Sequence, residues 1–174
     1  MSNTAPKLRL PKIVEADPRG TTLLHELEKR GFALWPESTV MIPEAHPDLH
    51  LTATLKDVYV KGQIVRGLEG AERTLAAEER GLRIADGKSE QPRGVRISRL
   101  LLLADDGSER FYRQVEKLLL RHGPRVLAIR LTIDAGGLGE MLFGPGKIAR
   151  LIMLEHKTAV GSVLLSLADQ WMKP

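Results

Sequence analysis

A continuous run of apolar residues in the second half of the chain constrains the fold more than any other feature. From Leu100 to Ala104 every residue is apolar, and the run ends at Asp105-Asp106-Gly107. A short apolar run that does not alternate, closed by a turn sequence, is typical of a strand buried on both faces. We therefore expect a strand over 97–104, in a sheet that other elements cover on both sides.

Helices and strands are expected to alternate around this strand. Apolar residues three and four positions apart predict helices, and glycines stand where two of these helices are expected to end. The expected helices are 67–80 (ending at Gly81), 111–122, 137–143 (ending at Gly144) and 158–171. The other expected strands are 125–133 and 147–154, and 84–94 is expected to be a loop. This order predicts an α/β fold, a three-layer α/β/α sandwich with a small mixed sheet, over residues 62–174.

The first 61 residues follow a different pattern and are expected to form an N-terminal extension or small lobe. Leucines at 23, 24 and 27 predict one short helix over 21–30. Prolines at 36, 43 and 47 favour an irregular loop after it. Residues 51–60 alternate well enough to predict a strand, and a second short strand is expected around 8–14.

Composition narrows the classes of function. The chain has 26 Lys and Arg residues against 22 Asp and Glu, a net charge of +4, which permits a polyanionic partner without requiring one. Cysteine is absent, which excludes thiolate metal sites and cysteine nucleophiles. The longest apolar run is too short to span a bilayer and the first twelve residues do not resemble a signal peptide, so we expect a cytoplasmic protein with no membrane partner.

The order of elements from residue 64 onward resembles a known family. The segments that carry the resemblance are Ile64-Val65-Arg66-Gly67, Arg80-Gly81, Leu100–Asp105, Val126–Ile133 and Leu138-Gly139-Glu140. They resemble the kink-turn-binding ribosomal-protein superfamily, which includes ribosomal proteins L-seven-Ae and L-thirty-e, over about 62–171. The turn that begins at Leu138-Gly139 is one residue longer here and ends at Gly144. The family's Asn-Glu pair is replaced by Gly67-Leu68-Glu69-Gly70.

The resemblance implies a non-catalytic protein that binds structured RNA or belongs to a ribonucleoprotein. It places the start of the 67–80 helix beside the glycine-rich loop at 144–150, where backbone amides and basic side chains reach phosphates. The candidate RNA-binding residues are Arg66, Gly67, Arg73, Gly144, Gly146, Lys147, Ile148 and Arg150. The alternative interpretation of these residues is a set of solvated charges around a tight turn.

Two other functions compete with RNA binding. Carboxylates that follow buried strands, at Asp105, Asp106 and Asp134, are compatible with a metal-dependent enzyme. The proline-rich N-terminal part is compatible with an interaction module that forms a homo-oligomer. No nucleophile elbow, phosphate-binding loop or dinucleotide fingerprint is present, so we expect no cofactor and no catalytic residue.

Overall fold

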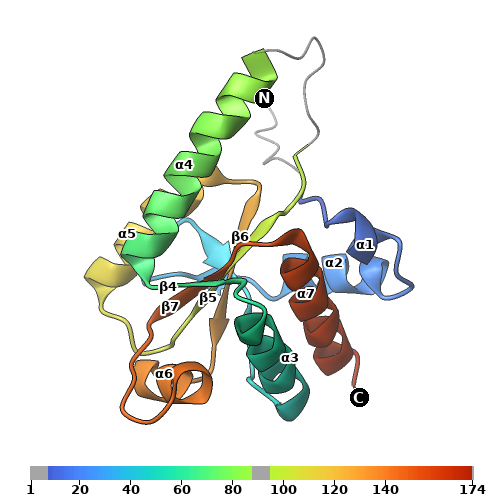
Figure 1. Cartoon of the computed structure of the whole chain (residues 1–174). Coiled ribbons are helices and arrows are strands. Elements are labelled where there is room, and N and C mark those ends of the chain that lie inside the picture. Colours follow the sequence, from blue (N-terminus) through green and yellow to red (C-terminus); the bar gives the residue numbers. More distant parts are fainter. Residues whose placement is uncertain (1–7, 88–94, 174) are drawn as a thin grey trace.

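The computed structural model describes residues 8–87 and 95–173, and a five-stranded mixed sheet lies at its centre (Figure 1). The strands are β3 (Glu44–Ala45), β4 (Ile64–Arg66), β5 (Arg99–Leu103), β6 (Val126–Leu131) and β7 (Leu151–Leu154). Their order across the sheet is β3-β6-β5-β7-β4. β6 is parallel to both of its neighbours, whereas β7 is antiparallel to β5 and to β4.

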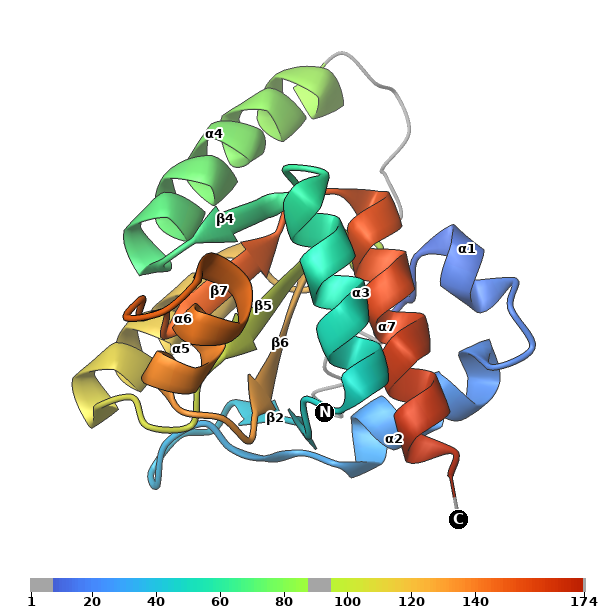
Figure 2. The same ribbon diagram turned by 60° about the horizontal axis from the view of Figure 1, so that its bottom comes forward.

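Helices cover both faces of the sheet, which confirms the three-layer α/β/α architecture. α4 (Leu68–Gly87) and α5 (Glu109–His122) lie on one face, and α3 (Leu49–Val60) and α7 (Lys157–Trp171) lie on the other (Figure 2). α1 (Lys12–Glu15), α2 (Gly20–Lys29) and α6 (Ala135–Phe143) join the α3 and α7 side. β1 (Phe32–Ala33) and β2 (Met41–Ile42) form a separate antiparallel pair.

The central strand β5 shows why the apolar run is continuous. Leu100 and Leu102 pack into the core under α3 and α7, while Leu101 and Leu103 pack into the core under α4 and α5. All four side chains are fully buried. Side chains alternate between the faces of a strand, so a sheet covered on both sides needs an apolar residue at every position.

α4 is longer than its predicted span of 67–80, and Gly81 does not end it. The helix continues to Gly87, so 84–87 is helical, and the remainder of the expected loop falls at 88–94, outside the described residues. Gly81 keeps a negative φ, whereas a glycine that caps a helix usually takes the left-handed conformation. The ion pair between Glu79 and Arg83, one helical turn apart at 2.8 Å, spans the glycine.

The N-terminal part corrects two predictions. Residues 51–60 form most of α3 and are not a strand, because the Asp48 side chain accepts a hydrogen bond from the Leu51 amide at 2.8 Å and starts a helix. Leu51, Leu55 and Val58 are its buried residues, spaced four and three apart as in a helix. Around 8–14 the structure has the short helix α1 in place of the expected strand. The predicted helix at 21–30 is present as α2.

The N-terminal part contributes directly to the main core. Leu10, Val14, Leu23 and Leu27 belong to the same buried cluster as the residues of α7. β3 extends the central sheet by pairing with β6. The division of the chain near residue 61 stays a prediction. Among the described residues, no helix is both long and apolar enough to cross a membrane.

Candidate nucleic-acid interface

The turn from β4 into α4 forms one side of the candidate site. Gly67 joins the two elements with a φ of 87°, in the left-handed region that favours glycine. Its amide donates a hydrogen bond to the Leu151 carbonyl at 2.9 Å, and its carbonyl accepts one from Ala71 at 3.1 Å. The first turn of α4 is therefore held against the start of β7, with its free amides at the protein surface.

The loop between α6 and β7 forms the other side. Gly144 (φ 108°) and Gly146 (φ 75°) both take conformations that L side chains rarely adopt. The Lys147 amide closes the turn onto the Gly144 carbonyl at 3.2 Å, and the Ala149 amide donates to Ala135 at 3.0 Å. Ala149 is buried, so the loop is anchored there, while residues 145–148 are exposed.

Arg66 joins the two sides. Its guanidinium donates a hydrogen bond to the Ile148 carbonyl at 2.8 Å and lies 4.6 Å from the centre of the Phe143 ring. β4 and β7 are paired so that Arg66 stands opposite Ile152. We call Arg66, Gly67 and residues 144–150 the corner surface. The expected closeness of the helix start and the glycine-rich loop is confirmed.

Within the described part of the chain, no carboxylate forms an ion pair with the basic side chains of the corner surface. Arg66, Lys147 and Arg150 are exposed, and none of them forms an ion pair within residues 8–87 and 95–173. Arg150 is fixed by its backbone, because its carbonyl accepts a hydrogen bond from Ala104 at 2.8 Å. The nearest acidic residue in sequence is Glu69, in the first turn of α4. The surface therefore offers three cations and a helix N-terminus to an anion.

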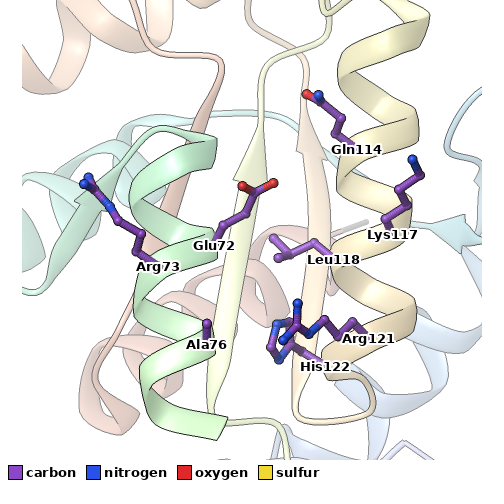
Figure 3. A pocket seen from close by; sticks show the side chains of 8 residues that line it. All are labelled: Glu72, Arg73, Ala76, Gln114, Lys117, Leu118, Arg121 and His122. Carbon is purple, nitrogen blue, oxygen red and sulfur yellow. The ribbon is translucent and has the colours of Figure 1, made fainter. Parts of the chain in front are cut away.

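Arg73 is the one predicted residue that lies apart from this surface. It stands further along α4, where it lines a groove between this helix and α5, and its guanidinium is directed away from α5 (Figure 3). No hydrogen bond or ion pair among the described residues joins it to the 144–150 loop. That the corner residues and Arg73 bind RNA stays a prediction.

Two of the three carboxylates at the strand ends, Asp106 and Asp134, act as helix caps, and Asp105 is exposed. Asp134 accepts a hydrogen bond from the Gly137 amide at 2.6 Å, and Asp106 accepts one from the Ala135 amide at 3.0 Å. Both therefore hold the start of α6. Among the residues that the structure describes, no three His, Asp or Glu side chains gather closely enough to hold a metal ion.

Two aromatic residues at the edge of the corner surface were not singled out by the sequence patterns. Phe143 stacks under Arg66, and Tyr59 meets the Phe143 ring edge-on with 5.2 Å between ring centres. Tyr59 is 44% exposed. The chain has only three Phe and two Tyr residues, so their scarcity is a signal that could have identified them.

Comparisons with known proteins find similarity among solved structures alone. No family model matches the chain, and no curated protein matches it. A solved structure of a protein of unknown function from Bacillus halodurans C is 17% identical, with a TM-score of 0.44 over 70% of this chain and 99% of the other. A 15.5kD RNA binding protein from Giardia lamblia is 18% identical, with a TM-score of 0.44 over 70% of this chain and 84% of the other. At these TM-scores neither structure bears on what this chain binds.

Proposed function

We propose that the chain binds structured RNA through the corner surface, without catalysing a reaction. The observation that carries the proposal is the set of exposed cations, Arg66, Lys147 and Arg150, which form no ion pair among the described residues. Arg66 directly precedes the start of α4 and contacts the 144–150 loop that carries the other two. Left-handed glycines on both sides let a phosphate backbone approach the amides closely. Contacts of this kind position a nucleic acid by its phosphates.

The shape of the corner surface favours a folded RNA over a plain duplex. Ile148 is 54% exposed, and it stands beside the half-buried Phe143 and the Arg66 guanidinium. Apolar and planar groups at a phosphate-binding surface suit the splayed nucleotides of loops and bulges, which a continuous duplex does not offer.

Fluorescence anisotropy across a salt series tests the proposal. The ligands are a kink-turn RNA, a plain RNA duplex and a DNA duplex, all labelled at one end. We expect tighter binding to the kink-turn RNA that persists at moderate salt. Equal and salt-steep binding to all three ligands would mean general basicity alone, and no binding at low salt would leave self-association as the better hypothesis.

A double variant locates the binding surface. Lys147→Gln with Arg150→Gln should weaken RNA binding and lower the slope of log K against log salt by about 0.9 for each duplex phosphate that the protein no longer neutralises. The matched control is Lys12→Gln with Lys29→Gln, which removes two exposed cations from α1 and α2, outside the corner surface. If both double variants bind RNA equally weakly, the corner surface is not the binding site.

A further inference from the structure

A groove separates α4 and α5 on the outer side of the molecule and has a volume of 490 Å³ (Figure 3). Small-molecule sites in proteins are usually between about 300 and 1,000 Å³, so the groove is large enough for a ligand of nucleotide size. It is distinct from the corner surface, because none of the corner residues lines it.

The chemistry of the groove differs between its two ends. Figure 3 shows Glu72 and Gln114 toward one end, Arg121 and His122 toward the other, and the apolar side chain of Leu118 between them. One end therefore offers an amide and a carboxylate for hydrogen bonds to hydroxyl and amino groups. The other end offers a guanidinium that matches the geometry of a phosphate.

His122 places an imidazole on the wall of the groove. Its side chain is only 2% exposed, and its Nδ1 lies 3.9 Å from the Glu79 carboxylate, beyond hydrogen-bonding distance. No hydrogen bond to its ring is present among the described residues. Among the described residues, the buried side-chain atoms without a hydrogen-bond partner are Arg130 Nε and Ser166 Oγ, so the His122 ring nitrogens are not enclosed and can bond a ligand that enters the groove.

Arg121 keeps donors available to a ligand in the groove. Its guanidinium is 3.4 Å from the Glu79 carboxylate, and its side chain is 64% exposed. An arginine has five N–H donors, so one loose carboxylate contact leaves a full edge of the guanidinium free to bind another group. Lys117 adds a second cation on the same wall.

We infer that the α4–α5 groove binds a nucleotide, either free or as one residue of an RNA chain. The phosphate lies at Arg121 and His122, the sugar lies over Leu118, and the sugar and base groups bind Glu72 and Gln114. The cationic end of the groove binds the phosphate, the amide and carboxylate at the other end bind hydroxyl and amino groups, and Leu118 contacts the carbon atoms of the sugar between them. No covalent step is involved.

Titration of the full chain with adenosine monophosphate and guanosine monophosphate, followed by NMR and calorimetry, tests the inference. We expect saturable binding, with shifts confined to the amides of α4 and α5. Adenosine and inorganic phosphate alone should bind more weakly, because each occupies only one end of the groove. A short single-stranded RNA forms the second arm, and binding to it but not to the free nucleotides assigns the site to an RNA residue. No saturable binding to any of these probes at millimolar concentration overturns the inference.

Two variants identify the ends of the groove. Arg121→Gln should weaken binding of the monophosphate about tenfold, the loss expected for one charge-assisted hydrogen bond, and leave binding of adenosine unchanged. Glu72→Gln should weaken the binding of both ligands.

Arg80→Gln is the control, because Arg80 is an exposed α4 cation outside the groove. Nucleotide binding that responds to Arg80→Gln as strongly as to Arg121→Gln contradicts the inference. The Lys147→Gln, Arg150→Gln double variant should leave nucleotide binding intact, which separates this test from that of the corner surface.

Discussion

The middle of α4 and its N-terminal end use charged residues in opposite ways. Toward the C-terminal half, Glu78 accepts hydrogen bonds from Arg99 at 2.8 Å and from Arg125 at 2.9 Å, which ties the helix to β5 and to the start of β6. At the N-terminal end, Arg66 and the loop residues Lys147 and Arg150 form no ion pair among the described residues. The same residue types hold the fold together at the middle of the helix and face solvent at its start.

Burial explains the difference. The side chains of Arg99, Arg125 and Glu78 are 18%, 12% and 23% exposed, so each charge is largely removed from water and needs its partner. The corner cations are exposed and remain hydrated, so the fold does not require a partner for them. A net charge of +4 therefore does not reveal which basic residues can reach a ligand.

The largest effect is expected from breaking the ion pairs that join Glu78 to Arg99 and Arg125. Glu78→Gln should lower the free energy of unfolding by about 3 kcal/mol, because it leaves two mostly buried guanidinium groups without a carboxylate. Urea denaturation measures the loss, and RNA affinity measured below the unfolding transition should not change. A loss of less than about 0.5 kcal/mol, the usual size for a surface change, would show that this cluster is no more important than a surface ion pair.

The second prediction tests the geometry of the corner. A Cβ added at Gly139 would lie 2.3 Å from the Lys147 carbonyl oxygen and 2.6 Å from the Ile148 Cα, so the loop backbone would have to move. Gly139→Ala should cost about 2 kcal/mol of stability through overpacking and should weaken RNA binding.

Gly136→Ala is the control in the same helix. A Cβ there meets nothing closer than the Asp134 carboxylate at 3.6 Å, so this variant should fold and bind like the unchanged protein. Equal behaviour of the two variants in thermal denaturation and anisotropy would mean that loop position is not linked to Gly139.

A smaller effect is expected from removing the acidic residue at the corner. Glu69 lies in the first turn of α4 and is exposed, so it repels a phosphate that approaches the helix N-terminus. Glu69→Gln should raise RNA affinity about threefold at low salt, with a loss of only a few tenths of a kcal/mol in stability. Glu28→Gln on α2 is the control. Tighter binding for both variants would point to net charge and not to the corner.

The smallest effect concerns how the stability of the fold depends on pH through His122. Burial lowers the pKa of the His122 imidazole from its ordinary value of 6.5; Glu79 and Glu78 act to raise it, while Arg125 and Arg121 lower it. The unfolded chain therefore binds a proton more readily than the folded chain, and stability present above pH 6.5 is lost as the pH falls below it. Denaturation at several pH values should show that His122→Gln removes part of this loss. His25→Gln, on the exposed surface of α2, should leave the profile unchanged.

Much of the fold is predictable because its signals are local. The helices expected at 21–30, 111–122 and 158–171 are present, since each has apolar residues at helical spacing. The segment 51–60 was predicted wrongly because its apolar residues match a strand period as well as a helical one. The Asp48 cap and the packing of α3 against α7 decided the outcome.

The candidate site was only partly predictable. The resemblance to a known family, and not periodicity, placed Arg66 near the 144–150 loop. Phe143, Tyr59 and the groove residues other than Arg73 were missed because a helical pattern shows which face is apolar but not which neighbouring helix lies beside it. The position of Arg73 away from the corner also depends on the rotation of α4 against the sheet.

By itself, the sequence determined that the chain has a sheet buried on both faces, because only a strand between two layers needs five consecutive apolar residues from Leu100 to Ala104. Tertiary structure alone decided which charges are paired and which groups meet. Arg66 and Ile148 are 82 positions apart and come together through the antiparallel pairing of β4 with β7. The α4–α5 groove exists because two helices that pack on one face of a sheet leave space between their outer side chains. Such distances depend on packing between elements, which no local pattern of residues specifies.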